Sequence, residues 1–365
     1  MAPFPATIEQ PVRERVQIAL DPVRNAITSM MLIAKEEEMP GTHPWVIQTR
    51  TSLSTGELFT HKLVILGFFH AIQPQTERKT FPEYLKELEG TDPEALRDRM
   101  LQEYEKVCFN CDLEEVKKPV NWQQILQSAD AYVDFLLRRF GEELVDVELE
   151  TKAYEYVTNP PALKELVTSH LRWFWEKHLS AEYARLQPIL QESIRAFQET
   201  DFSGMSQLEA ARYITGQDLD EESWNMLANE FEQFEFIPNA HIGPYLTKLP
   251  CDKKLAIIFG ARQPENASVR IPELDRADIV ARMSAIADDT RLMILQMISE
   301  SGEMRSQDVI DAIGLSQPSV SRYLKQLTVT GYLQERRVNG AKAYTLNRNR
   351  IEKTLKAVHK YLLGN

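Results

Sequence analysis

Residues 277–346 place the tightest constraint on the fold, because four patterns follow one another at close spacing. An apolar helix pattern, IADDTRLMILQMI (286–298), leads to a shorter one, SQDVIDAIG (306–314). A third helix pattern, SQPSVSRYLKQL (316–327), precedes ERRVNGAKAYTL (335–346), which carries the Asn-Gly pair of a hairpin turn. Helix, short helix, turn, helix and hairpin in this order predict a winged helix-turn-helix, a fold that places one helix in the major groove of DNA.

Side chains suited to helix ends support these boundaries. Asp288 or Asp289 is a suitable N-cap for the first helix, Ser306 for the second and Ser316 for the third. Gly314 stands where a helix commonly ends in a left-handed residue. The sequence therefore predicts three separate helices here and not one long helix.

The third helix pattern has two chemically different faces. Val320, Leu324 and Leu327 recur at spacings of four and three, so we expect them to face the core. The opposite face carries groups that donate to phosphates or to base edges, and the hairpin adds basic side chains. We predict a DNA-binding surface formed by Ser316, Gln317, Pro318, Ser319, Ser321, Arg322, Lys325, Arg336, Arg337 and Lys342.

Two stretches resemble a known family of regulators. IADDTRLMILQMI resembles the ArsR-type segment in which an Arg-Leu pair leads into an Ile/Leu-rich helix, and GLSQPSVSRYLKQLTVTGYLQERRVNGAKAYTL resembles that family's recognition helix and wing. The resemblance covers about a quarter of the chain, and residues upstream of it resemble the extended members, which carry a large N-terminal helical domain. It implies a homodimeric transcriptional regulator that releases DNA when an effector binds.

The best-known metal sites of that family have no counterpart in this sequence. One such site uses cysteines on the helix before the recognition helix, where RSQDVIDAIG has none. The other uses paired histidines and carboxylates on the last helix, where His359 is the only histidine. We therefore predict no metal site and no cofactor.

The last helix pattern carries an apolar stripe at spacings of four, three and four. In a monomer such a stripe would belong to the core, whereas the family resemblance implies a dimer seam shared with the helix around 278–287. A two-fold dimer would bind near-palindromic half-sites about 10 bp, or a multiple, apart. The predicted dimer interface consists of Ile351, Leu355, Val358 and Leu362.

The net charge of −12 conceals a strong asymmetry along the chain. Residues 277–365 contain thirteen Lys and Arg against nine Asp and Glu, and within 316–360 the count is ten against two. A basic segment attached to an acidic body is typical of a phosphate-binding module on a separate domain.

The rest of the chain predicts a mainly α fold. Apolar residues recur at helical spacing through much of 1–236, whereas 231–261 combines aromatic and β-branched residues with Pro and Gly, which favours a small β-hairpin or sheet. Residues 263–275 (QPENASVRIPELD) have the composition of a linker. We predict a mostly helical domain over 1–262, a linker over 263–275 and a winged helix domain over 276–365.

Weaker patterns admit alternative interpretations. Cys108 and Cys111 form a CxxC, which we interpret as ordinary thiols, with a redox switch as the alternative. His170 and His178 flank LRWFWEK, about 12 Å apart along a helix and too far for one metal ion. We expect a packed helix junction there, with an aromatic-lined ligand pocket as the alternative. His241 would suit a general base, but no nucleophile motif accompanies it.

Together these patterns predict a sequence-specific DNA-binding transcriptional regulator, most simply a repressor tuned by a small-molecule effector, and not an enzyme. Its partners would be double-stranded DNA and a second copy of the chain. The longest apolar run, 63–69 (LVILGFF), is too short to cross a bilayer, and no secretory signal is evident, so we expect a cytoplasmic protein without membrane contact. The alternative is an enzyme, or a small-molecule-binding domain, over 1–262 with a regulatory winged helix.

Overall fold

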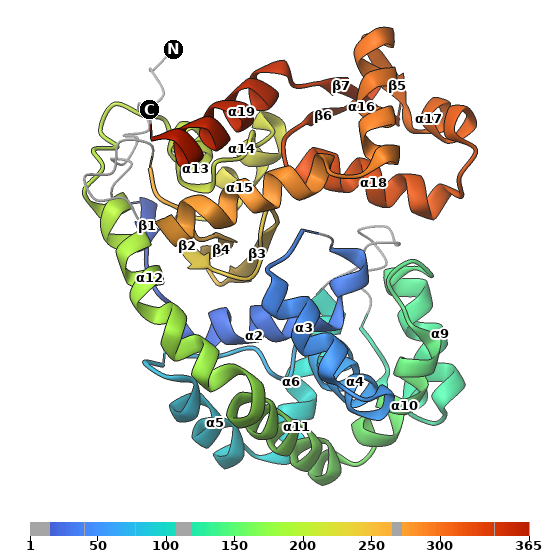
Figure 1. Cartoon of the computed structure of the whole chain (residues 1–365). Coiled ribbons are helices and arrows are strands. Elements are labelled where there is room, and N and C mark those ends of the chain that lie inside the picture. The colour runs from blue at the N-terminus through green and yellow to red at the C-terminus, as the bar shows by residue number, and fades with distance from the viewer. Residues whose placement is uncertain are drawn as a thin grey trace, which may run out of the picture. The chain divides into compact units, whose positions relative to one another are not determined.

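The chain divides into two compact units in the computed structural model (Figure 1). The C-terminal unit consists of residues 1–20, 35–46 and 185–365, and the helical unit consists of 21–34 and 47–184. The predicted domain boundary near residue 262 falls inside the C-terminal unit and stays a prediction. The structure describes residues 15–39, 41–76, 78–106, 119–264, 272–338 and 340–364.

The helical unit is built from short amphipathic helices whose first turns are capped by side chains. Ser54 and Glu57 form a capping box at one start, and the carboxylate of Asp146 and the amide oxygen of Asn159 accept from backbone N–H groups at two others. The α-helices are α2 (Pro22–Ala34), α3 (Pro44–Ser52), α4 (Thr55–Lys62), α5 (Phe81–Gly90), α6 (Pro93–Lys106), α8 (Trp122–Ile125), α9 (Ala129–Phe140), α10 (Val147–Val157) and α11 (Pro160–Phe174). Helix α3 begins in the C-terminal unit, and α12 (Ser180–Gln198) also contributes to both units.

Two of these helices continue into π-helical turns. Helix α4 runs into η2 (Leu63–Gly67), and α11 runs into η3 (Trp175–Leu179). Sequence periodicity predicts helices through both segments without indicating the wider turn, which adds one residue to the helical ring and shifts the faces that follow. Around them Phe68, Leu171 and Phe174 are fully buried.

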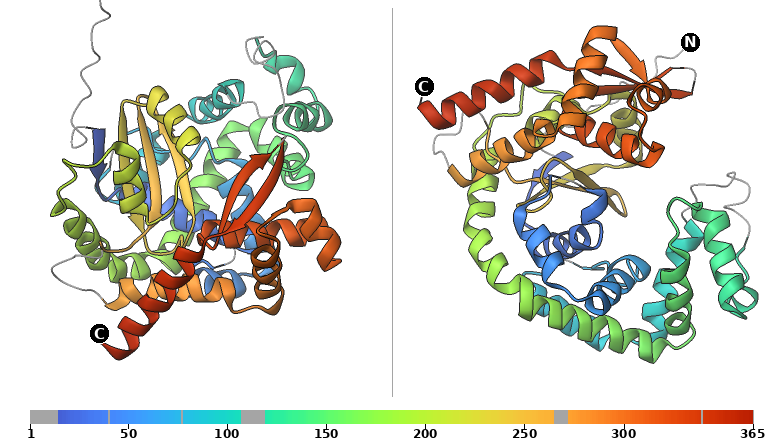
Figure 2. Two further views of the ribbon diagram at one scale, coloured as in Figure 1. Left: turned by 90° about the horizontal axis from the view of Figure 1, so that it is seen from above. Right: turned by 45° about the vertical axis from the view of Figure 1, so that its right-hand side comes forward.

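The C-terminal unit contains a four-stranded sheet in the order β1-β2-β4-β3. Strands β2 (Gln233–Asn239), β3 (Leu246–Cys251) and β4 (Lys254–Gly260) confirm the predicted small sheet, with β3 and β4 as its antiparallel hairpin. Strand β1 (Val16–Ile18) pairs in parallel with β2 and lies at the sheet edge, in blue in the left view of Figure 2. Helices α12, α13 (Gln207–Thr215) and α14 (Glu221–Glu230) pack against the sheet around Phe197, Trp224, Phe234, Phe236 and Phe259.

The C-terminal part of this unit is the predicted winged helix. Its helices are α15 (Pro272–Ile286), α16 (Asp289–Ser301), α17 (Ser306–Ile313), α18 (Gln317–Val329) and α19 (Arg348–Leu363). Strands β5 (Glu303–Arg305), β7 (Ala341–Leu346) and β6 (Leu333–Val338) form an antiparallel sheet in that order, with the β6–β7 hairpin as the wing. Val320, Leu324 and Leu327 are buried in its core, as their spacing predicts.

The helix starts in the winged helix follow the prediction with one exception. The carboxylate of Asp288 accepts from the N–H of Arg291, and Gly314 is left-handed, as predicted. The prediction of Ser306 as a cap is wrong, because α17 begins at Ser306 and the N-cap position falls on Arg305. There the carboxylate of Asp308, at the third helical position, accepts from the backbone N–H of Arg305, which is the reciprocal bond of a capping box.

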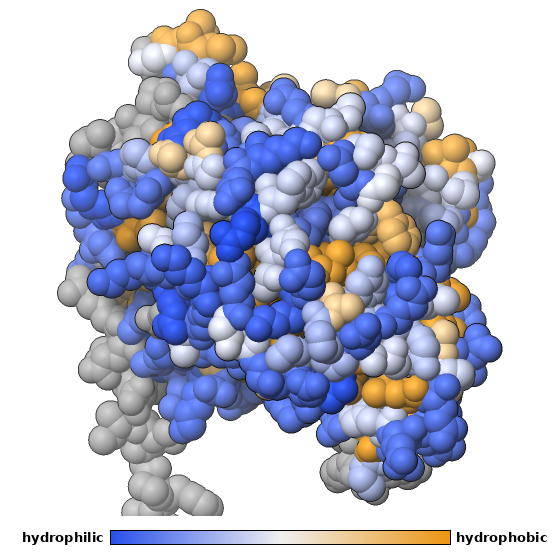
Figure 3. All heavy atoms as spheres, turned by 90° about the horizontal axis from the view of Figure 1, so that it is seen from below, coloured by the Kyte–Doolittle hydropathy of each residue, from blue (hydrophilic) through white to orange (hydrophobic). Residues whose placement is uncertain are grey.

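The surface of the molecule is mainly polar on the face that Figure 3 draws. Most of the face drawn in Figure 3 is hydrophilic, and its apolar residues lie in small separate patches. Among the described helices, none has both the length and the apolar content that crossing a membrane requires.

Candidate nucleic-acid interface

Helix α18 presents a polar face to solvent. Gln317, Ser321, Arg322 and Lys325 are exposed, whereas every third or fourth residue on the other side is buried. The predicted surface residues Ser316 and Pro318 are exposed as well, and Ser319 is half-buried. This arrangement leaves the polar side chains of α18 available to a groove.

The start of α18 is organised by serine hydroxyls and by proline. Ser316 occupies the N-cap position, as predicted, but its Oγ lies 2.9 Å from the Oγ of Ser319 and makes no bond to a backbone N–H of the first turn. Pro318 lies in that turn, where a missing N–H has no cost. The side chain of Ser316 therefore leaves the first-turn N–H groups of α18 uncapped, and N–H groups at the start of a helix are suited to bind phosphate.

Arginine side chains near α18 divide into two roles. Arg291 donates from Nε to the carbonyl of Ala285 at 2.6 Å and from Nη2 to that of Ser284 at 2.8 Å, so it fastens α16 to the end of α15. Its guanidinium carbon also lies 5.7 Å from the centre of the Tyr323 ring. Arg322, whose guanidinium carbon is 5.9 Å from the same ring, is exposed. Arg291 is thus structural, and Arg322 is placed at the surface.

Carboxylates hold two of the three predicted wing cations. Arg336 donates to Glu303 at 2.5 and 2.9 Å, and the Nζ of Lys342 lies 3.0 Å from Glu335. The hydrogen bonds from Arg336 lower the pKa of Glu303, which keeps that carboxylate ionised. Sequence reasoning did not single out Glu303 or Glu335. A phosphate that approaches the wing would compete with these two carboxylates.

An apolar surface lies on the winged helix along α16 and α19. Leu355 is 56% exposed and Leu362 is 69% exposed, while Ile351 and Val358 are half-buried. Next to Ile351 a hollow of about 260 Å³ is lined mainly by apolar side chains. Its lining consists of Ile286, Leu292, Leu295, Gln296, Ser299, Tyr332, Leu346 and Ile351.

Comparison with known proteins places this geometry in a family. The helix-turn-helix model described as bacterial regulatory protein, arsR family, matches residues 288–335, from the N-cap of α16 into the wing. An uncharacterized HTH-type transcriptional regulator of Methanocaldococcus jannaschii is 32% identical over 74 residues, which are 20% of this chain and 83% of that protein. The chain belongs to the ArsR family.

Two further relatives of this ArsR-family chain carry functional names. An arsenic resistance transcriptional regulator of Pseudomonas putida and the arsenical resistance operon repressor of Escherichia coli are each 42% identical over 52 residues, or 14% of this chain. The chain spans 41% and 44% of their lengths. No solved structure matches it. The family match makes the winged helix the DNA-binding domain of a transcriptional regulator.

Two histidines of the helical unit lie in a packed junction. His61 is fully buried, and its Nδ1 lies 3.0 Å from Nε2 of His170, while its Nε2 lies 2.8 Å from the carbonyl of Met30. Burial lowers the pKa of His61 to about 3 and that of His170 to about 4. Both rings are therefore neutral at pH 7, and His61 is a partner that sequence spacing did not indicate.

Aromatic residues between His170 and His178 face different surroundings. Phe174 is buried, and Trp175 stacks on Phe81 with ring centres 4.8 Å apart. Trp173 lines an open hollow of about 420 Å³ with Glu89, Glu165, Thr168, Ser169, Arg172 and Glu176.

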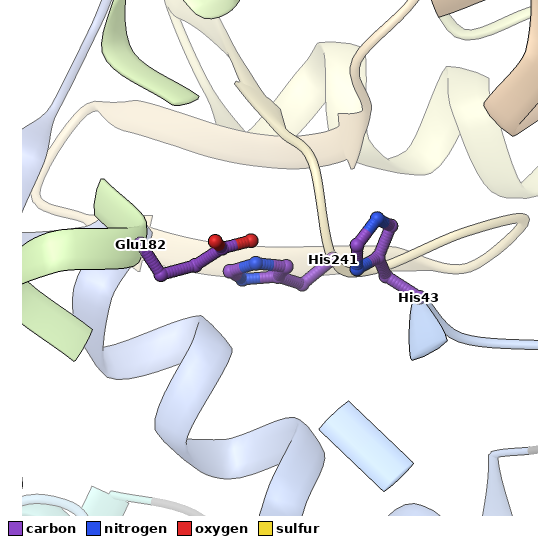
Figure 4. A group of neighbouring side chains, drawn as sticks. All are labelled: His43, Glu182 and His241. Atoms are coloured by element: carbon purple, nitrogen blue, oxygen red, sulfur yellow. The ribbon is translucent and has the colours of Figure 1, made fainter. Parts of the chain in front are cut away.

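His241 also lies in an aromatic environment. Its ring stacks on Trp45 at 4.4 Å between ring centres, and the centre of the His43 ring is 5.4 Å away (Figure 4). Glu182, also drawn there, belongs to the helical unit. The remaining candidates, Cys108 and Cys111, lie outside the described residues.

Proposed function

We propose that this protein is a homodimeric, sequence-specific repressor in the cytoplasm, whose affinity for double-stranded DNA is changed by a small-molecule effector. The observation that carries the proposal is the match of residues 288–335 to the arsR family on a winged helix whose α18 exposes a polar, basic face. The names of two relatives, an arsenic resistance transcriptional regulator and an arsenical resistance operon repressor, support regulation by repression.

In this proposal α18 enters the major groove. Arg322 and Lys325 would contact phosphate or base edges. Gln317, Ser319 and Ser321 would read base edges or position the recognition helix. Ser316 and Pro318 would set the helix end against a phosphate. The wing residues Arg336, Arg337 and Lys342 would bind the DNA backbone or the adjacent minor groove. Arg336 and Lys342 would first have to leave their carboxylate partners for a phosphate.

The apolar stripe on α19 supports a dimer. Leu355 and Leu362 expose large side chains that a partner helix would cover. Ile351 and Val358 would complete the seam, together with α15, which packs against α19 and leaves Val280 exposed. Two copies related by a two-fold axis would present two α18 helices to adjacent major grooves.

Residues 1–262 would form the effector-sensing or dimer-supporting domain, joined through 263–275 to the winged helix. The hollow beside Trp173 in the helical unit supports an effector-sensing role. The sheet and the helices that pack on it form a separate core that supports a structural role. We assign no catalytic step to this part of the chain. Turnover of a small molecule by the full-length protein would contradict that assignment.

The test begins with selection of duplexes from a random library by the full-length chain. We expect a recurrent, near-palindromic sequence that survives excess nonspecific competitor and is bound less tightly as salt rises. Sedimentation should show two chains per duplex. Retention of unrelated sequences alone would contradict sequence-specific binding.

A further inference from the structure

A loop of the sheet core contacts the winged helix at two points. The loop, residues 216–220 between α13 and α14, is called here the 216–220 loop. Gln334 of β6 donates its side-chain amide to the carboxylate of Asp218 at 2.7 Å. Arg350 of α19 donates from Nη1 to the carbonyl of Gly216 at 3.2 Å. Both bonds join segments of the C-terminal unit.

Arg350 connects the ends of two helices. Its Nε donates to the carbonyl of Thr330 at 2.7 Å, and Thr330 is the C-cap of α18. Gly216 is the C-cap of α13. Carbonyl groups at helix C-termini carry partial negative charge, so a cation between two such ends is stabilised by both. The planar fork of arginine reaches two acceptors at once, which an ammonium group on a flexible stem does less well.

Two glycines leave room for the arginines at these helix ends. Gly216 has φ +67°, and a Cβ there would collide with the guanidinium of Arg262. Gly331 has φ +83°, and a Cβ there would lie 3.0 Å from Nε of Arg350. Arg262 follows β4 and donates to the carbonyl of Tyr213 at 2.9 Å. The sheet and the winged helix therefore hold the same end of α13 from two sides.

The surroundings make Arg350 sensitive to its acceptors. Burial lowers the pKa of Arg350 to about 10, and the nearby charge of Arg282 adds to the shift. The side chain remains a cation at pH 7, and a partly buried cation is costly unless its donors are satisfied. Displacement of the 216–220 loop would remove one of its carbonyls.

We propose that Arg350 and the Gln334–Asp218 bond are positioning contacts, which fix α18 and the wing relative to the sheet core. The proposal rests on the proposed function, because it concerns how that DNA-binding surface is oriented. An effector that moved the 216–220 loop would change the orientation of α18 and of the wing together. Neither Arg350 nor Asp218 is assigned a DNA contact.

The test compares full-length variants on two probes, a duplex selected by the wild-type chain and a random duplex of equal length. Asp218→Ala and Glu221→Ala each remove one exposed negative charge near the loop. Only Asp218 bonds to Gln334, and it also lies 3.6 Å from Nε of Arg212 in a half-exposed ion pair. We expect Asp218→Ala and Arg350→Ala to bind the selected duplex at least fivefold more weakly than Glu221→Ala does. Affinity for the random duplex and the salt slope should match those of Glu221→Ala. Arg350→Lys should recover part of the loss.

A double-mutant cycle isolates the bond to the wing. Asp218 and Gln334 contribute through the one bond that joins them. The variant carrying both Asp218→Ala and Gln334→Ala should therefore bind the selected duplex no more weakly than either single variant. Equal affinities of Asp218→Ala and Glu221→Ala for the selected duplex would overturn the proposal, even if Arg350→Ala fails to fold. A reduced salt slope in Arg350→Ala would overturn it by showing a direct phosphate contact. Failure of the wild-type chain to select any sequence would overturn the proposed function itself.

Discussion

Basic side chains in the winged helix have distinct partners, although they contribute equally to its charge. Arg291 and Arg350 donate to backbone carbonyls and hold helices together. Arg336 is paired with Glu303 of β5, and Lys342 is paired with Glu335 of β6. Arg322 is exposed on α18. The net charge of the whole module would attract DNA, whereas we propose that sequence discrimination depends on a few side chains such as Arg322.

Replacement of Arg322 tests base reading at a single position. We expect Arg322→Ala to weaken binding to the selected duplex by about 1–3 kcal/mol and to relax the preference at one base pair. Lys86→Ala, which removes an exposed cation from the helical unit, is the control. Competition titrations give both quantities. A loss that is uniform across sequences would reassign Arg322 to phosphate, and no loss would remove it from the interface.

Replacement of Lys342 tests the wing. If Lys342 leaves Glu335 for a phosphate, Lys342→Ala should lower the slope of log affinity against log salt by about 1. The matched control is Lys254→Ala, an exposed lysine on β4. Titrations at four salt concentrations measure the slope. A slope equal to that of the control would exclude Lys342 from the contacts.

At the scale of elements, packing in the helical unit depends on neutral histidines. Helices α2, α4 and α11 meet where His61 contacts His170 and the carbonyl of Met30. Two π-helical turns, η2 and η3, directly follow the helices that carry these rings. Protonation of either ring would place a charge in a buried junction, so the stability of this unit should depend on pH.

The direction of that dependence follows from the two lowered pKa values. Free histidine has a pKa near 6.5, so the unfolded chain binds protons below that pH while folded His61 and His170 stay neutral down to about pH 4. Their contribution is complete above pH 6.5 and is lost as the pH falls. We expect the free energy of unfolding to drop by about 2–3 kcal/mol between pH 6.5 and 5.

Urea unfolding at those two pH values measures this drop. His170→Gln should reduce the pH dependence, because one buried ring with a lowered pKa is gone, whereas His359→Gln, on an exposed side chain of α19, should leave it unchanged. An unaltered dependence in His170→Gln would show that other groups control it.

We propose that helix α19 contributes to stability and to assembly through different faces. Thr354 is buried, whereas Leu355 and Leu362 are exposed in the single chain. Replacing both leucines by glutamine should change the stability of the monomer by less than about 0.5 kcal/mol each. Sedimentation should nevertheless show a shift from dimer to monomer. Lys353→Gln, on the opposite side of the helix, should remain dimeric, and a dimeric leucine variant would contradict the proposed seam.

The sequence predicted best those features that depend on neighbours along the chain. The winged helix follows from local periodicity, from capping at Asp288 and from the left-handed Gly314. The pairing of β1 with β2 and the contact of His61 with His170 join segments far apart in sequence, and no local pattern specifies them. The surface position of the α18 side chains was predictable, while the carboxylate partners of Arg336 and Lys342 depend on how strands align in the wing sheet.

For the whole molecule, we propose that two copies of this chain read one DNA sequence through α18. The most direct measurement is an equilibrium titration of the full-length protein, against the duplex it selects and a scrambled duplex, at two salt concentrations. We expect two chains per selected duplex, an affinity about 10³-fold or more above that for the scrambled duplex, and a steep loss of affinity with rising salt. Equal affinity for the two duplexes would contradict it.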